Sequence, residues 1–256
     1  MTDTSSSNSE SRIPIARRTV LVAGGATAAA LAVGGAASAG ALDGTGQDTA
    51  AAVCTLTREM TEGPYYLDGQ YVRSDISEGK PGVPLKLTLT VVDDDTCAPL
   101  RGALVELWHA DALGEYSGFV GKNGHSEPDN GTFLRGGVLT NSAGVAVITS
   151  IYPGWYVGRC IHIHVKVHTG VTLTSDGHFT GGREIHTGQL FFSETVTTRV
   201  ATVSPYSTNR VTRTTLARDS IYDGGGAASG LLILSALGSS PSAGYAGALT
   251  LGVETG

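Results

Sequence analysis

The sequence has little of three things: sustained helical periodicity, clustered positive charge and aromatic side chains. Beyond residue 40, no ten-residue stretch repeats its apolar residues with the period of a helix, which argues against an α-helical fold. The formal net charge is −6, and no cluster of lysine or arginine interrupts it, so nucleic acid is not an expected partner. Aromatic residues make up only 6% of the chain, so a region where they gather with other reactive side chains is informative.

The N-terminal region predicts an export signal. Arg17 and Arg18 precede an uncharged segment rich in alanine and glycine that ends at Ala39, where small residues fit a signal cleavage site. Paired arginines before a weakly hydrophobic segment are typical of twin-arginine export. A transmembrane anchor is the alternative, but the glycines and the cleavage site favour removal of residues 1–39. We therefore expect a secreted, extracellular protein without a stable membrane anchor.

The rest of the chain predicts an all-β fold, because short stretches alternate apolar and polar residues and turn-forming residues separate them. The expected strands are 85–92, 103–108, 145–151, 161–167, 189–192, 231–237 and 246–253. The stretches 111–137 and 169–188 are glycine-rich without a sustained period, and loops of such length are usually functional or disordered. We expect a β-sandwich of mixed or antiparallel strands with long glycine-rich active-site loops, formed by residues 61–256 behind a mobile lead-in, residues 40–60.

Three cysteines follow the expected signal, namely Cys54, Cys97 and Cys160. In an oxidising compartment an even number of them should pair. Cys54 and Cys97 both lie in polar sequence outside the expected strands, so we predict a disulfide between them. Cys160 shares the strand parity of the histidines that follow it and is expected to stay a free thiol.

The most informative stretch is 151–167, which reads IYPGWYVGRCIHIHVKV. Its second half alternates strictly, so isoleucine and valine form one face of a strand while His162 and His164 lie on the other. The rise per residue places these two residues about 7 Å apart along the strand. A Pro-Gly turn just upstream brings Tyr156 and Arg159 next to them. A histidine pair alone fits a polar strand face as well as a metal site, and the neighbouring residues favour the metal site.

Tyrosine in this region points to iron. All seven histidines lie between His109 and His186, and both tryptophans and Tyr116 lie in or beside the same region. A phenol with a pKa near 10 ionises at neutral pH only beside a strong Lewis acid, and ferric iron suits the hard phenolate oxygen. A zinc or copper hydrolase or oxidase is an alternative that leaves the tyrosines idle. A secreted β-sandwich binding or adhesion module is an alternative without catalysis.

Six segments resemble the intradiol ring-cleavage dioxygenase family, and within it a secreted, twin-arginine-exported actinobacterial branch. They are EGPYY at 62–66, ELWHAD at 106–111, GEYS at 114–117, IYPGWY at 151–156, RCIHIH at 159–164 and QLFF at 189–192. The family is that of the catechol 1,2- and protocatechuate 3,4-dioxygenases. The resemblance implies an Fe(III) enzyme that takes a catechol and O2, cleaves the ring between its two hydroxylated carbons and yields a cis,cis-muconate.

The resemblance also implies roles for individual residues. The implied ferric ligands are Tyr116, Tyr156, His162 and His164, of which Tyr156 is displaced by the substrate. Arg159 would stabilise the anion that develops on the ring. The implied substrate-lining residues are Gln189, Trp155 and Trp108. Tyr152 matches a non-ligand position of the family, and His109 is expected to lie behind the site.

Two departures from the family limit what can be transferred. The connection from Tyr156 to His162 is shorter than in the familiar catechol enzymes, so we expect a wide, mostly uncharged pocket mouth. The helical N-terminal region through which many catechol enzymes dimerise has no counterpart here, so a homodimer stays open as the assembly.

Overall fold

A computed structural model describes residues 54–119 and 131–256. The expected export signal, residues 1–39, and residues 40–53 of the expected lead-in lie outside the described residues. The strands are β1 Pro84–Asp93, β2 Leu104–Trp108, β3 Arg135–Leu139, β4 Val145–Ile151, β5 His162–Thr169, β6 Thr172–Leu173, β7 Phe179–Thr180, β8 Arg183–Phe191, β9 Ile233–Ala236 and β10 Tyr245–Val253. The helical elements are α1 Glu194–Val200, α2 Ala227–Ser229, a π-helical turn Tyr222–Gly226 and 3-10 turns at Tyr206–Thr208, Leu216–Arg218 and Pro241–Ala243. Within the described ranges, no helix has the length and apolar character needed to cross a bilayer.

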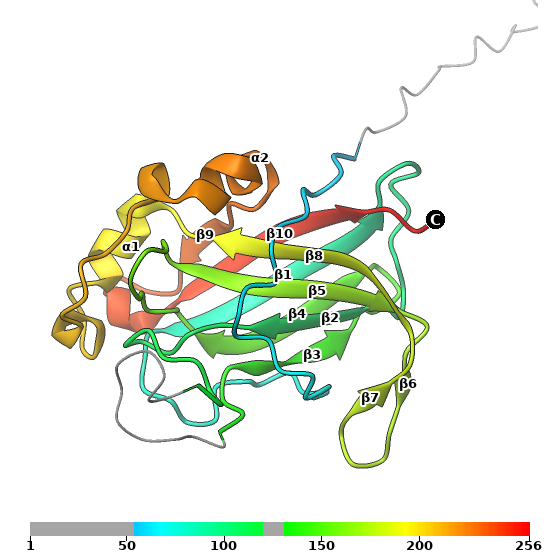
Figure 1. The fold of residues 1–256 in the computed structure, drawn as a ribbon, viewed down its shortest axis with the longest axis horizontal. Coiled ribbons are helices and arrows are strands. Elements are labelled where there is room, and N and C mark those ends of the chain that lie inside the picture. The colour runs from blue at the N-terminus through cyan, green and yellow to red at the C-terminus, as the bar shows by residue number, and fades with distance from the viewer. Residues whose placement is uncertain (1–53, 120–130) are drawn as a thin grey trace, which may run out of the picture. The chain divides into compact units, whose positions relative to one another are not determined.

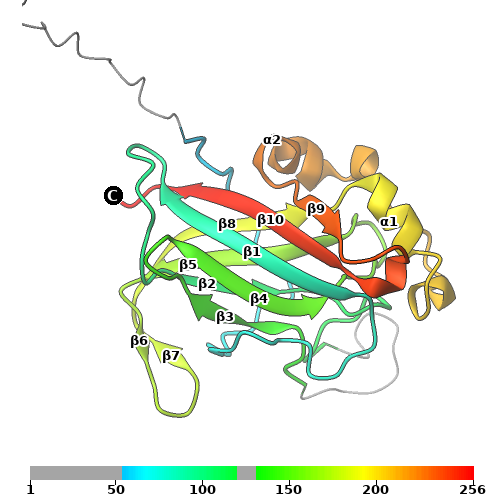
Figure 2. The same cartoon turned by 180° about the vertical axis from the view of Figure 1, so that it is seen from behind.

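Two four-stranded sheets form the layers of the fold, in the strand orders β4-β1-β10-β9 and β3-β2-β5-β8. Figure 1 is seen from the side of the second sheet, and Figure 2 from the side of the first. β1 runs parallel to β10, whereas β2, β4, β5 and β8 pair with their neighbours in antiparallel fashion. The predicted all-β class with mixed strands is therefore confirmed.

The hydrophobic core lies between the two sheets and uses the apolar half of each alternating strand. Leu87 of β1, Leu107 of β2 and Val165 of β5 are each fully buried in one continuous cluster. Each such side chain contributes roughly 1.5–3 kcal/mol when it leaves water. Because successive side chains of a strand point to opposite faces, burial of Ile163 and Val165 places His162 and His164 on the outer face of the second sheet.

Several stretches carry regular structure that the sequence did not predict, among them the short strands β6 and β7 inside the expected loop 169–188. β3 begins inside the expected loop 111–137, and β8 extends well upstream of the expected strand 189–192. The upstream end of β8 is solvent-exposed, so it has no need of the apolar residues by which the strand was recognised. Helix α1 has only seven residues, too few for a helical period to show in the sequence, and it begins where the Ser193 side chain accepts a hydrogen bond from the Val196 amide.

The segment after Cys54 is fixed to both sheets. The Thr57 amide donates to the Gly252 carbonyl over 2.8 Å, and the Met60 amide donates to Thr187 over 2.9 Å. The segment then crosses the outer face of the second sheet and reaches its far edge, where the Gly137 amide donates to the Tyr71 carbonyl over 2.9 Å (Figure 1). Residues 60–72, called the strap below, thus cover the face that carries the histidines.

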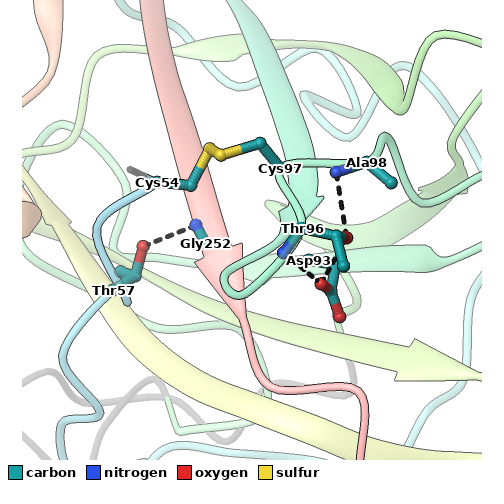
Figure 3. Close-up of a disulfide and its surroundings, with 7 residues drawn as sticks. All are labelled: Cys54, Thr57, Asp93, Thr96, Cys97, Ala98 and Gly252. Carbon is teal, nitrogen blue, oxygen red and sulfur yellow. Dashed lines mark hydrogen bonds between the residues drawn. A yellow bond between two sulfur atoms is a disulfide. The ribbon is translucent and has the colours of Figure 1, made fainter. Parts of the chain in front are cut away.

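Cys54 and Cys97 form the predicted disulfide, with their Cα atoms 5.5 Å apart (Figure 3). Cys160 is free and buried, as expected. The bridge joins the beginning of the described chain to the turn after β1 and lies close to the Thr57–Gly252 hydrogen bond. It therefore holds the segment that precedes the strap against the first sheet.

We expect the Cys54→Ser/Cys97→Ser double variant to lose about 2–4 kcal/mol of unfolding free energy. The bridge spans 43 residues of sequence, and closing a loop of that size removes much of the freedom of the unfolded chain. Urea denaturation with and without reductant measures the loss, and the reductant should affect only the wild type. An unchanged midpoint in the variant would contradict this role.

Candidate metal centre

Strand β5 presents the two central histidines from the middle of its sheet. His164 lies between Trp108 on β2 and Gln189 on β8. The Trp108 indole stacks on the His164 imidazole with ring centroids 4.8 Å apart and an angle of 6° between the planes. The stack fixes the ring orientation of His164, whose side chain the strap also covers: a Cβ at Gly63 would lie 3.2 Å from its Cε1 atom.

Two phenols and two imidazoles converge at one point, the Nε2 atom of His162. The Tyr116 hydroxyl lies 3.4 Å from this atom and the Tyr156 hydroxyl 3.3 Å. Nε2 of His164 lies 3.2 Å from it. The loop after β2, the turn after β4 and strand β5 thus bring together the four residues that the sequence singled out as metal ligands.

Hydrogen bonding alone does not explain this cluster. Nδ1 of His162 lies 2.7 Å from the Cys160 carbonyl, so Nδ1 carries the proton and Nε2 keeps a single lone pair. One lone pair accepts one hydrogen bond, yet Nε2 has the Tyr116, Tyr156 and His164 groups around it. Nδ1 of His164 is buried, and no partner for it is found among the described residues.

The spacing of the four donor atoms suits one metal ion. Imidazole nitrogen and anionic oxygen bind metals such as zinc at about 2.0–2.2 Å, which places the donor atoms about 3–3.5 Å apart. The observed separations from His162 Nε2 are 3.2–3.4 Å. The Nδ1 contact of His162 with a backbone carbonyl is the arrangement that usually orients a metal-bound histidine. Tyr116, Tyr156, His162 and His164 could therefore hold a metal.

Without a metal ion, desolvation favours the neutral forms of both phenols and both imidazoles. Desolvation, together with the nearby Arg159 guanidinium, lowers the pKa of His162 to about 3, so its imidazole is in the metal-binding form at neutral pH. Desolvation also lowers the pKa of His164. The pKa of Tyr156 is raised by desolvation to about 12, and desolvation also raises the pKa of Tyr116 well above its usual value. Only a strong Lewis acid would ionise both phenols.

Arg159 approaches the same point from the turn before β5. Its Nη1 lies 3.4 Å from Nε2 of His162, and its Nη2 donates to Gln189 Oε1 over 2.6 Å. Its Nε donates to Asp219 over 2.8 Å. Desolvation raises the pKa of Asp219, but hydrogen bonds from Arg159 and the Cys160 amide outweigh it and lower that pKa to about 2. The Asp219 carboxylate is therefore ionised at neutral pH and forms an ion pair with the guanidinium.

The strap covers the four clustered side chains on the outer face of the second sheet. Tyr65 stacks on Tyr116 with ring centroids 4.5 Å apart and meets Tyr156 edge-on at 5.8 Å. Below it, the Lys166 ammonium bridges Glu62 at 2.5 Å and Glu184 at 2.6 Å. The strap is thus held by an ion pair and by aromatic contact, and it keeps water away from the buried Tyr116.

Three residues weighed in the sequence lie elsewhere. Trp155 packs in the core between the sheets, and its indole donates to the Val211 carbonyl over 2.7 Å, so its side chain is directed away from the cluster. Tyr152 is fully buried and its hydroxyl bonds to Thr197 at 2.8 Å. His109 lies behind the site and contacts the Ser150 hydroxyl at 2.7 Å through Nε2. Gln189 lies beside the cluster, between Arg159 and the Thr61 carbonyl.

Sequence reasoning missed Asp219, Tyr65 and Glu62 as parts of the site. Tyr65 and Glu62 lie in the EGPYY segment, whose resemblance to the family marked it without assigning a role. Asp219 lies in a Thr/Arg-rich stretch without periodicity, and no signal in the sequence connects it with Arg159.

Comparison with known proteins supports the relationship that the motifs indicated. The model of the family described as "Dioxygenase" matches residues 61–170. Catechol 1,2-dioxygenase of Acinetobacter baylyi is 32% identical over 151 residues, which is 52% of this chain and 46% of that protein. The chain thus spans about half the length of this curated relative.

Solved structures extend the similarity over most of the chain. An intradiol ring-cleavage dioxygenase from Tetranychus urticae is 31% identical, with a TM-score of 0.69 over 78% of this chain and 95% of that one. The dioxygenase domain of a carbohydrate-binding fusion protein from Streptomyces sp. SirexAA-E shares the fold, with 24% identity and a TM-score of 0.55 over 79% of this chain and 100% of that one.

Proposed function

The chain belongs to the intradiol ring-cleavage dioxygenase family, and from this premise we propose that it is a non-haem Fe(III) enzyme that opens catechol-type rings. The proposed reaction uses O2, cleaves the bond between the two hydroxylated carbons and gives cis,cis-muconate-type products. The observation that carries the proposal is the convergence of two phenols and two imidazoles within 3.4 Å of one atom.

The proposed ligands of the iron are Tyr116, Tyr156, His162 and His164. Bound ferric iron would supply the positive charge that ionises both phenols and draws electron density from a bound catechol. Two phenolates and two neutral imidazoles suit a hard trivalent ion better than zinc, which rarely needs tyrosine. The zinc and copper alternatives would leave the phenols of Tyr116 and Tyr156 without a function.

Tyr156 is the phenol that we propose to yield its place to the substrate. Tyr156 directly precedes an exposed turn whose Val157 is 78% exposed, whereas Tyr116 is 1% exposed and stacked against Tyr65. Because the pKa of free Tyr156 is about 12, its released phenolate takes up a proton at neutral pH. We infer that one catechol hydroxyl would supply this proton, so that this oxygen of the substrate would be deprotonated while Tyr156 leaves as a neutral phenol.

Arg159 is placed to stabilise the negative charge that develops on the ring. Of its three nitrogens, Nε and Nη2 are held by Asp219 and Gln189, and Nη1 faces the cluster. A charged donor oriented before the reaction, in a site shielded from water, is commonly the largest single contribution to such catalysis.

The substrates we propose are catechol and ring-substituted catechols. One exposed turn connects Tyr156 to His162, and its apolar Val157 lies at the surface. A short connection whose one charged side chain is Arg159 favours broad acceptance of substituents at the pocket mouth.

We further propose that the protein acts outside the cell. The twin-arginine pattern at Arg17 and Arg18 supports this. So does the Cys54–Cys97 disulfide, since such bridges persist in oxidising compartments.

Metal analysis and product analysis together test the proposal. We expect one iron per chain, a broad visible absorption band from phenolate–iron bonds, and a muconate that carries both atoms of isotopically labelled O2. Zinc in place of iron, with no band after iron loading, would contradict the metal assignment. A yellow semialdehyde from catechol would contradict the proposed position of cleavage.

A further inference from the structure

The buried carboxylate of Asp219 lies beside the candidate site although it is far from it in the sequence. Asp219 is 2% exposed and follows the 3-10 turn Leu216–Arg218, beyond residues 61–170 that the family model matches. A buried carboxylate is costly unless it is paired and hydrogen-bonded, so its partners indicate what it holds in place.

Each carboxylate oxygen of Asp219 accepts two hydrogen bonds. Oδ2 accepts from the Arg159 Nε at 2.8 Å and from the Cys160 amide at 2.7 Å. Oδ1 accepts from the amides of Ile221 at 2.9 Å and Tyr222 at 3.1 Å. The carboxylate is therefore fixed to its own segment through Oδ1 and bound to the turn before β5 through Oδ2.

The hydrogen bond from Arg159 Nε to Asp219 sets the direction of the Arg159 side chain. A guanidinium is planar, so fixing its Nε edge on Asp219 and its Nη2 on Gln189 also fixes Nη1, which lies 3.4 Å from His162 Nε2. The Arg159 side chain is 19% exposed, so without the carboxylate it has a route toward solvent.

We propose that Asp219 is a positioning residue that holds the Arg159 guanidinium toward the metal centre and thereby sets the rate of ring opening. This proposal rests on the proposed function and adds to it a residue outside the matched motifs. Asp219 is hydrogen-bonded to Arg159 and to the amides of Cys160, Ile221 and Tyr222, so in our proposal it acts on the reaction through Arg159, while its bond to the Cys160 amide anchors the turn.

The variant Asp219→Asn tests the proposal with the smallest change of shape. Each carboxylate oxygen of Asp219 faces two N–H donors. In asparagine an NH2 group, which cannot accept a hydrogen bond, replaces one of these two oxygens. We expect full iron content, an unchanged phenolate–iron band and a catechol dissociation constant within about twofold of the wild type. The turnover number should fall roughly 10- to 100-fold, the scale for a misplaced catalytic group.

Asp93→Asn is the matched control. Asp93 ends β1 in the first sheet, and its two carboxylate oxygens accept hydrogen bonds from the Thr96 amide at 2.8 Å and the Thr255 hydroxyl at 2.6 Å. This variant should keep wild-type turnover. Equal slowing in both variants, or loss of iron in Asp219→Asn, would show that Asp219 supports only the fold and would overturn the proposal.

A double-mutant cycle tests whether Asp219 acts through Arg159. Because Asp219 has no other route to the reaction in our proposal, Asp219→Asn should slow the Arg159→Ala enzyme no further. A further tenfold loss in the double variant would overturn the proposal. If Asp219→Asn does not fold, Asp219→Glu keeps the charge but shifts it by one methylene, and its turnover should fall while iron is retained. Unchanged turnover of Asp219→Glu would equally overturn the proposal.

Thermal unfolding separates this proposal from the proposed function. The loss of melting temperature in the Asp219→Asn/Arg159→Ala double variant should be smaller than the sum of the single losses, whether or not the protein opens catechol. Additive losses would show that the two residues are not coupled. A wild type that is inactive toward every catechol, with coupled melting temperatures, would refute the proposed reaction and leave the Asp219–Arg159 contact confirmed.

Discussion

Replacing Tyr156 by phenylalanine should leave iron in the protein while catechol turnover falls roughly 10²–10³-fold, the range expected when a group that takes up a proton is lost. Three ligands remain in this variant, so iron content and part of the visible band should persist. Replacing Tyr116 by phenylalanine should instead weaken iron binding itself. The loss should exceed roughly 10- to 100-fold, which is the loss of metal affinity expected when only a hydrogen-bond partner of a ligand is removed.

The difference follows from the surroundings of the two phenols. Tyr116 is 1% exposed and stacked under Tyr65 at 4.5 Å, so its hydroxyl has no room to move away. Tyr156 is partly buried and begins the exposed turn before Arg159, so it can leave without disturbing the core. A fixed phenolate supports the metal throughout, and a movable one frees a position for the substrate.

Iron content per chain and steady-state oxygen uptake measure the two effects separately. Tyr152→Phe is the matched control, because Tyr152 is a buried tyrosine in the same segment whose hydroxyl contacts Thr197. It should keep its iron and activity and lose only about 1 kcal/mol of stability. Equal iron loss in the Tyr116 and Tyr156 variants would mean that their roles are misassigned.

Replacing Arg159 by alanine should slow ring opening roughly 10²–10³-fold, the scale for loss of one oriented donor at a developing negative charge. Iron and the spectral shift on catechol binding should remain, since Arg159 is not among the four converging ligand candidates. Stopped-flow spectroscopy can observe binding and ring opening as separate steps. A lost binding shift with normal ring opening would assign Arg159 to substrate binding instead.

Two further variants control for the loss of charge. Arg159→Lys keeps the positive charge but lacks the planar fork that joins Asp219, Gln189 and the cluster, so its rate should be intermediate. Arg213→Ala removes an arginine from its ion pair with Glu194, away from the site, and should leave turnover unchanged.

The sequence alone determined the character of β5 and its two faces. Strict alternation from Ile161 to Val167 requires one face to be apolar and the other polar, because successive side chains of a strand point in opposite directions. Once the isoleucines and valines enter the core, His162 and His164 must lie together on the other face. The same alternation predicted most of the strands. The position of Cys54 and Cys97 in polar sequence outside those strands predicted their disulfide, with Cys160 left free.

Only the tertiary structure decided which distant residues complete the site. Tyr65 reaches Tyr116 because the strap crosses the sheet, and Trp155 turns into the core although it adjoins Tyr156 in the chain. Asp219 meets Arg159 across 60 positions of sequence. A carboxylate in an aperiodic stretch has no local pattern that names its partner, because the energy of such a pair depends on burial and on distances that exist only after the chain has folded.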